Sequence, residues 1–265
     1  MYKIGVFDSG VGGLTVLKEI EALLPNSHII YFADNVNSPY GDKTGDEITK
    51  LCIRIAYFLT MRNVDAIVIA CNTATAAAFE TLKKKFNVPI IGVIEPGVRT
   101  ALKASKNGDI SVIGTLATMN LNAYKKTFFA LAGEKIKITQ RGCKLLCPMI
   151  ENGWIDKYTS YFTDEILRLY LEGISENSDT LILGCTHYPL IKDDIRKFFT
   201  KTIIDPAHET ALELLHSLKN TEPKNKNIKP LVQFIVSGEI NNFRKIAEKF
   251  LKRDISNIIK MDISY

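Results

Sequence analysis

Short apolar segments alternate with helix-like stretches along almost the whole chain, and this alternation limits the possible fold more than any other feature. Several of the apolar segments are rich in Ile and Val, as strands that are buried on both faces tend to be. Between them, apolar residues such as Ile48, Cys52, Ile55 and Leu59 recur with helical spacing. The alternation favours an α/β fold with mainly parallel sheets. We predict strands at residues 3–7, 28–32, 65–70, 89–94, 109–114, 135–139, 180–184, 202–205, 231–237 and 257–261.

The composition limits the size and the partners of the protein. Its 265 residues suffice for one large α/β domain or for two domains of ordinary size. The net charge of +5 is mild, and the densest basic run, residues 83–85, falls at the predicted end of a helix, where cations are favoured. No basic stripe or known binding motif accompanies this charge, so we expect no nucleic-acid partner.

The N-terminus and the cysteines indicate the compartment. The first residues, MYKIGVFDSG, lack the pattern of a secretory signal, and no apolar stretch reaches the roughly 18 residues of a membrane span. We therefore expect a cytoplasmic protein with no membrane partner. The five cysteines show no disulfide spacing, so we expect free thiols. Cys52 falls on the apolar face of a predicted helix, and Cys143 and Cys147 lack a second Cys/His pair, so we expect no metal site there.

Two segments of the chain resemble each other. DAIVIAC at residues 65–71 and DTLILGC at residues 179–185 each place a cysteine six residues after an aspartate. A helical stretch follows each cysteine, and a second predicted strand then ends in an acidic residue and a proline, at residues 94–96 and 204–206. This weak repeat indicates two related halves, each of which presents a cysteine at the carboxyl end of a strand.

Ligands in open α/β sheets bind outside the carboxyl ends of the strands, where three polar motifs of this chain stand. The first motif is DSGVGG at residues 8–13. Its glycines allow a tight turn, and the following helix would direct free N–H groups at an anion such as a carboxylate. A glycine-rich turn that binds nothing is an equal alternative. The spacing fits neither the phosphate-binding nor the dinucleotide motif.

The second and third motifs each begin with a cysteine. Cys71 opens a predicted helix, whose dipole should lower the pKa of the thiol, and the next two residues, Asn and Thr, offer donors to a carboxylate. Cys185 is followed by the donor Thr186 and by His187, which could exchange protons with the thiol. A buried cysteine that packs as a small hydrophobe, and a purely structural histidine, are the alternatives.

Five motifs in this order carry a resemblance to a known family: IGVFDSGVGGLTV, NSPYG, ACNTAT, VIGT and LGCTHYP. Together they resemble the bacterial glutamate racemases of the aspartate/glutamate racemase superfamily, from Ile4 to about Glu209. The resemblance implies two similar α/β domains, pseudo-symmetric about an active-site cleft between them. The first would comprise residues 1–97 and 208–265, and the second residues 98–207.

The resemblance also implies a function. Glutamate would be the small-molecule substrate, no pyridoxal phosphate, metal or nucleotide would take part, and the D-glutamate would supply peptidoglycan synthesis. The resemblance is compatible with a homodimer as the assembly of the protein. Cys71 and Cys185 would be the acid/base pair, with Cys71 deprotonating D-glutamate and Cys185 deprotonating L-glutamate. Asp8 and His187 would assist these thiols. The substrate-binding positions would be Asp8, Ser9, Tyr40, Gly41, Asn72, Thr73, Thr115, Thr118, Glu151, Thr186 and His187.

The chain departs from the family pattern at one point, immediately before Pro148, where Cys147 stands. The chemistry itself fits two cysteines. Racemisation removes the α-proton from one face of the carbon and returns a proton to the other, so it needs two groups in opposite protonation states. Donors around the α-carboxylate would stabilise the charge that develops there.

Other functions remain open from the residues alone. An aspartate racemase would share the two-cysteine plan. A cysteine hydrolase or transferase would use Cys185 as nucleophile and His187 as base, but it leaves Cys71 and the repeat unexplained. A non-catalytic amino-acid-binding protein would use both cysteines only to line a cleft.

Overall fold

The computed structural model describes the chain except residues 155–159, 173, 175, 220, 225–228 and 264–265. Its strands form two sheets, one of six strands in the order β10-β9-β2-β1-β3-β4 and one of four in the order β6-β5-β7-β8, and the described strand pairs are all parallel. The strands are β1 (Lys3–Asp8), β2 (His28–Ala33), β3 (Ala66–Ile69), β4 (Ile90–Gly92), β5 (Asp109–Gly114), β6 (Lys137–Gly142), β7 (Thr180–Gly184), β8 (Thr202–Ile204), β9 (Leu231–Val236) and β10 (Ile258–Lys260).

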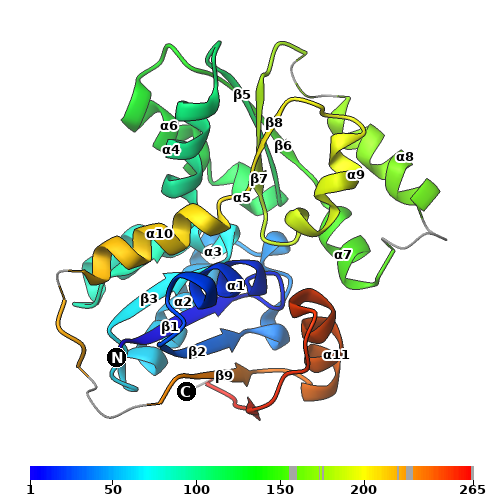
Figure 1. The fold of residues 1–265 in the computed structure, drawn as a ribbon. Helices are drawn as coiled ribbons and strands as arrows, with labels where there is room; N and C mark the ends of the chain where they lie inside the picture. The colour runs from blue at the N-terminus through cyan, green and yellow to red at the C-terminus, as the bar shows by residue number, and fades with distance from the viewer. Residues whose placement is uncertain (155–159, 173, 175, 220, 225–228, 264–265) are drawn as a thin grey trace.

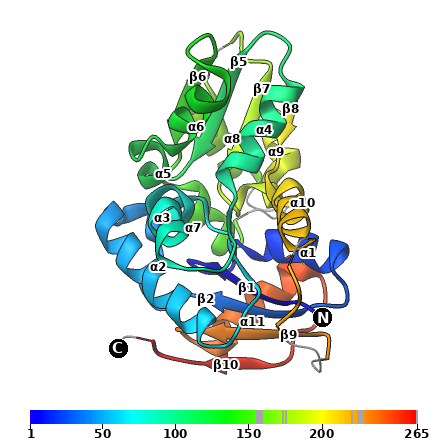
Figure 2. The ribbon, with the colours of Figure 1, turned by 90° about the vertical axis from the view of Figure 1, so that its left-hand side faces the viewer.

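Helices cover both faces of each sheet, and Figures 1 and 2 show the two helix-flanked sheets one above the other. The predicted α/β class with mainly parallel sheets is confirmed. The described α-helices are α1 (Leu14–Leu23), α2 (Gly45–Thr60), α3 (Asn72–Lys85), α4 (Ile94–Ala104), α5 (Leu116–Asn120), α6 (Ala123–Ala132), α7 (Leu146–Glu151), α8 (Ser160–Leu171), α9 (Lys192–Arg196), α10 (Ala207–Leu218) and α11 (Ile240–Leu251). None of these is long and apolar enough to cross a membrane.

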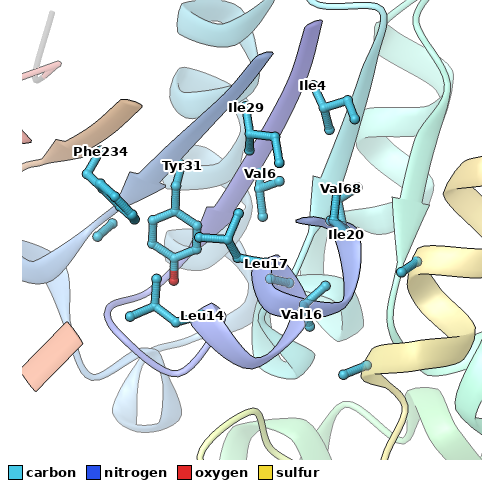
Figure 3. Close-up of a cluster of buried hydrophobic side chains, with 14 of the residues drawn as sticks. Ile4, Val6, Leu14, Val16, Leu17, Ile20, Ile29, Tyr31, Val68 and Phe234 are labelled. Carbon is cyan, nitrogen blue, oxygen red and sulfur yellow. The ribbon is translucent and has the colours of Figure 1, made fainter. Parts of the chain in front are cut away.

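The six-stranded sheet is buried on both faces because its strands are apolar at successive positions. In β1, Ile4 and Val6 face α1, α10 and α11, whereas Phe7 faces α2 and α3. Figure 3 shows Val6 and Tyr31 of the sheet against Leu17 of α1. The four-stranded sheet is enclosed in the same way, by α7, α8 and α9 on one face and by α4 and α6 on the other.

The predicted strand boundaries need two corrections. The strand predicted at 89–94 ends at Gly92, and Ile94 already begins α4. Glu95 and Pro96 therefore stand in the first turn of a helix, where an acidic side chain is stabilised by the dipole and a proline gives up no helical hydrogen bond. The strand predicted at 135–139 instead runs as β6 from Lys137 to Gly142, in register with β5 to its last residue.

Candidate active site

A cleft of about 410 Å³ lies where the carboxyl ends of strands from both sheets meet, within the size range of small-molecule sites. Both cysteines of the repeat line it, although they come from different sheets. A smaller cavity of about 250 Å³ between α3, α4 and α6 is lined by none of the predicted site residues. Among the predicted residues, the cleft is lined by Ser9, Tyr40, Gly41, Cys71, Asn72, Thr73, Thr115, Glu151, Cys185, Thr186 and His187.

Cys71 occupies the N-cap of α3, as the sequence indicates. Its Sγ accepts a hydrogen bond from the Ala74 N–H (3.4 Å) and lies 3.8 Å from Oγ of Ser9. Burial and, to a lesser extent, the nearby Asp8 carboxylate nevertheless raise the pKa of the thiol, which is about 12 despite the lowering effect of these donors. The expectation of a lowered pKa is therefore wrong for Cys71, because desolvation exceeds the effect of the helix N-terminus.

Asp8 lies at the end of β1, fully buried beside the cleft rather than on its wall. Its Oδ2 accepts the Gly10 N–H (2.8 Å), whereas Oδ1 has no hydrogen-bond partner among the described residues. Burial raises the pKa of this carboxyl group, and the positive charge of His187 opposes the shift. An incompletely hydrogen-bonded carboxyl group that interacts with a thiol is suited to exchange a proton with it.

Cys185 is connected to a histidine and a carboxylate. Its Sγ lies 3.6 Å from Nδ1 of His187, and Nε2 of the same ring lies 2.8 Å from Oε1 of Glu151. Burial disfavours the imidazolium, but the hydrogen bonds to Cys185 and Glu151 prevail and raise the pKa of His187 well above its usual value. Glu151, one of the substrate-binding positions that the resemblance implies, therefore lies on the far side of the imidazole from Cys185.

Cys147 also belongs to this cluster. Its Sγ lies 3.3 Å from Sγ of Cys185, and this contact, together with burial, raises the pKa of the Cys185 thiol well above its ordinary value. No second Cys/His pair stands close to Cys143 and Cys147 in the sequence, but the fold brings Cys185 and His187 to Cys147 from the segment after β7. The only signal in the sequence was the unusual cysteine before Pro148.

Hydroxyl and amide groups surround the cleft near Cys71. The Oγ1 atoms of Thr73, Thr115 and Thr118 lie 2.9 Å from one another, with Thr118 buried behind the other two. Oδ1 of Asn72 accepts the hydroxyl of Tyr124 (2.6 Å), which leaves the N–H groups of its amide as donors. The cleft thus offers several donors to a carboxylate.

Tyr40 lines the cleft, but its hydroxyl is used within the protein. It donates to Oδ2 of Asp34 at 2.6 Å. The adjacent Gly41 packs against Thr115, whose Cβ would lie 3.0 Å from a Cβ at this glycine.

The glycine-rich loop after β1 joins the two halves of the site. The Tyr31 hydroxyl donates to the Gly10 carbonyl (2.9 Å), and the Thr15 hydroxyl donates to the Thr186 carbonyl (3.3 Å). A Cβ at Gly12 would overlap Oγ1 of Thr186 and lie 2.5 Å from Nδ1 of His187. Gly12 is therefore needed for the close approach of this loop to Thr186 and His187.

Comparison with known proteins identifies the family. The model of the Asp/Glu/Hydantoin racemase family matches residues 4–214. The chain belongs to this family. It is 43% identical to a glutamate racemase of Fusobacterium nucleatum over 96% of this chain and 95% of that protein. Solved structures of this racemase family superpose over nearly the whole chain. A glutamate racemase isoform of Bacillus anthracis has a TM-score of 0.92 and 38% identity, covering 98% of this chain and 97% of that one.

The chain is also similar to a glutamate racemase whose structure was solved as a complex with D-glutamate. That relative is the glutamate racemase of Francisella tularensis, with a TM-score of 0.91 and 35% identity, covering 99% of this chain and 98% of that one. The resemblance that the five sequence motifs indicated is thus confirmed over almost the full length of the chain.

Proposed function

We propose that this protein is a glutamate racemase that interconverts L- and D-glutamate with Cys71 and Cys185 as its two acid/base groups and without a cofactor. One observation carries the proposal. The two thiols follow strands of different sheets and line the same cleft, each with its own titratable partner. A substrate held between them would present one face of its α-carbon to each thiol.

The surroundings of the thiols support a specific order of events. Both thiols are held protonated, because burial raises the pKa of Cys71 and the contact with Cys147, together with burial, raises that of Cys185. The ammonium group of a bound amino acid would favour a thiolate by its positive charge. Asp8 would accept the displaced proton of Cys71, and His187 in its neutral form would accept that of Cys185. The thiolate would then remove the α-proton while the opposite thiol protonates the other face.

Donors around the substrate would stabilise the carbanion. Charge develops on the α-carboxylate as the α-proton leaves, so preorganised donors lower the barrier. We assign this role to the amide of Asn72 and the hydroxyls of Thr73 and Thr186, with Ser9 and Thr115 as further contacts. Thr118 supports the other two threonine hydroxyls from behind.

The family supports a proposal for the substrate and the biological role. The relatives reported above are glutamate racemases, and one of them was crystallised with D-glutamate. We infer that glutamate is preferred over aspartate, and a kcat/KM that is equal for the two or higher for aspartate would refute this. We also propose that the D-glutamate supplies peptidoglycan synthesis and that the protein acts in the cytoplasm. We further propose that the protein forms a homodimer. Light scattering would test this assembly.

Two domains fit the arrangement of the strands. We propose that residues 1–97 with 208–265 form one domain and residues 98–207 the other. The six-stranded sheet draws its strands from both ends of the chain and the four-stranded sheet from the middle, which supports this division. On this reading, α4 crosses the first boundary and α10 begins at the second.

The decisive test is an assay with purified protein, L-glutamate and no added cofactor. Circular dichroism should decay to zero as the racemic mixture forms, and deuterium from the solvent should appear at the α-carbon. A covalent acyl-enzyme on Cys185, detected by mass spectrometry, would favour a hydrolase instead. Glutamate binding without α-proton exchange would favour a non-catalytic binding protein.

A further inference from the structure

Three potential metal ligands converge on one wall of the cleft. The ligand atoms of Cys147, Cys185 and His187 all lie within 4.8 Å of one another. The two sulfur atoms are 3.3 Å apart, and Sγ of Cys185 lies 3.6 Å from Nδ1 of His187. We propose that these side chains form an inhibitory Zn²⁺ site with two thiolates and one imidazole as ligands.

Two of the three ligand separations can be compared with those of tetrahedral zinc. Zn–S bonds of about 2.3 Å and Zn–N bonds of about 2.0–2.1 Å place a sulfur and a nitrogen about 3.6 Å apart, and two sulfurs about 3.8 Å apart. The first value matches the separation of Cys185 and His187. The two sulfurs must move apart by about 0.5 Å from their 3.3 Å separation. Cys147 can supply this movement by rotation of its side chain, because it is the less buried of the two cysteines.

The hydrogen bond on the far side of the imidazole favours metal binding. Nε2 of His187 lies 2.8 Å from the Glu151 carboxylate, so a proton on Nε2 leaves the lone pair of Nδ1 directed to the sulfurs. Histidines that ligate zinc commonly donate their other ring N–H to a carboxylate, which fixes the tautomer and increases the basicity of the ligand. Glu151 therefore holds the imidazole in the orientation that the proposed site needs.

The proposed site has an open coordination position. Cys147, Cys185, His187 and Glu151 all line the cleft, so a zinc ion held by three protein ligands would present its fourth position to water or to a carboxylate in the cleft. Cys143 lies four residues before Cys147 but outside this cluster, because its Sγ contacts the Arg141 carbonyl at 3.6 Å. It provides a matched control on the same wall.

Zinc binding would stop turnover in both directions. The metal displaces the thiol protons of Cys147 and Cys185 and occupies the sulfur lone pair that must accept or return the α-proton. It also displaces the proton that a charged His187 carries on Nδ1 and occupies that nitrogen. Each turnover uses both catalytic thiols, so blocking Cys185 alone is sufficient. This consequence rests on the proposed racemase function, whereas metal binding itself does not.

The experiment measures binding and inhibition separately on the reduced full-length chain. Co²⁺ absorption reports thiolate ligation through sulfur-to-metal charge-transfer bands, and calorimetry gives the affinity for Zn²⁺. We expect one equivalent of Zn²⁺ per chain. Loss of a hydrogen-bond partner of a ligand lowers zinc affinity by about 10–100-fold. Glu151→Gln weakens such a partner, so it should lower the affinity by about 10-fold. Cys147→Val removes a ligand itself, so it should lower the affinity by at least about 100-fold. Cys143→Val should bind as tightly as the unaltered chain.

Inhibition is then measured against the metal-free rate of each variant. Zinc should inhibit the unaltered chain and the Cys143→Val variant at the concentrations at which it binds, a chelator should restore the rate, and Cys147→Val should resist zinc. Absence of charge-transfer bands, or equal zinc affinity in the Cys147→Val variant, would overturn the site. A chain that binds zinc but does not racemise glutamate would refute the proposed function and leave the metal site intact. A Cys147–Cys185 disulfide in place of reversible zinc binding would also overturn it.

Discussion

Gly12 approaches Thr186 so closely that any side chain on the glycine would overlap the threonine hydroxyl. The contact joins the loop after β1 to the loop after β7, and so joins the surroundings of the two catalytic cysteines. A sequence of alternating strands and helices does not by itself bring these loops together. The close approach of Gly12 to Thr186 and His187 is therefore a structural requirement of the shared cleft.

Substitution of Gly12 should disturb this contact. In Gly12→Ala the new Cβ would lie 2.5 Å from Nδ1 of His187, so we expect a loss of about 1–3 kcal/mol in the free energy of unfolding and a lower racemisation rate. Gly10→Ala is the matched control, because its Cβ would meet only ordinary contacts, the nearest at 3.7 Å from Nδ2 of Asn35. Urea unfolding compares the two, and equal stability of both variants would contradict the close-packing argument.

Each thiol should be required for racemisation but for only one direction of proton removal. Cys71→Ser and Cys185→Ser should each nearly abolish racemisation, since a hydroxyl is a much weaker acid than a thiol. With a glutamate analogue that carries a leaving group on the β-carbon, elimination needs only the abstracting thiol. Cys71→Ser should eliminate from the L-analogue but not from the D-analogue, and Cys185→Ser should do the reverse. The same loss with both enantiomers would exclude face-specific bases.

The groups beside the thiols should contribute to proton transfer. Asp8→Asn and His187→Asn should lower kcat by about 10²–10⁴-fold with the fold retained, as for other acid/base groups. His208→Asn serves as a control, because His208 also pairs with a glutamate, Glu19 at 2.8 Å, but lies outside the cleft. Rates that match the unaltered chain in the first two variants would assign Asp8 and His187 a structural role only.

Asp179, at the start of the second repeat, should stabilise the fold above acidic pH. Partial desolvation opposes its ionisation, but hydrogen bonds from Ser105, Thr180 and the N–H groups of Lys106 and Asn107 prevail and lower its pKa to about 2. The unfolded value is about 3.9, so the stabilisation is complete above that pH and is lost as the pH falls through about 2. With allowance for solvent screening it amounts to about 1 kcal/mol.

The measurement is urea unfolding of Asp179→Asn and of the unaltered chain at two pH values. The variant should be less stable by about 1 kcal/mol at pH 7, and the difference should shrink towards zero near pH 2. A difference that does not change with pH would show that Asp179 acts through packing rather than through its charge.

Activity should not depend on an added cofactor. Dialysis against a chelator and treatment with hydroxylamine, which removes pyridoxal phosphate, should leave the rate unchanged. Where zinc from the preparation occupies the proposed inhibitory site, the chelator should increase the rate instead. Activity that is lost and then restored by pyridoxal phosphate would refute the two-thiol mechanism.

The sequence predicted the elements of the fold better than their boundaries. Strands such as β5 and β7 match the prediction residue for residue, because each is a short apolar segment that begins at or beside an aspartate and ends at a glycine. The acidic residue and proline of the first repeat were misplaced, since Glu95 and Pro96 are compatible with a strand end in sequence but begin α4 in the structure. Local sequence does not distinguish these two roles.

Two features of the site depend on tertiary structure. The pKa of Cys71 follows from burial beside Asp8, which no local pattern reveals. The contact of Cys147 with Cys185 joins residues of α7 and of the loop after β7, which are far apart in the sequence. In contrast, most of the residues that were assigned by resemblance do line one cleft, because the motifs follow strands whose carboxyl ends meet there.

The two thiols stand beside chemically different groups, a carboxyl group at Cys71 and an imidazole paired with a carboxylate at Cys185. Mirror-image substrates have the same free energy in water, so the equilibrium constant of their interconversion is unity. Any advantage that the imidazole gives to kcat in one direction must therefore be balanced by the same factor in KM. The unequal surroundings of the thiols can make the protein retain one enantiomer longer, but they cannot make it accumulate more of that enantiomer at equilibrium.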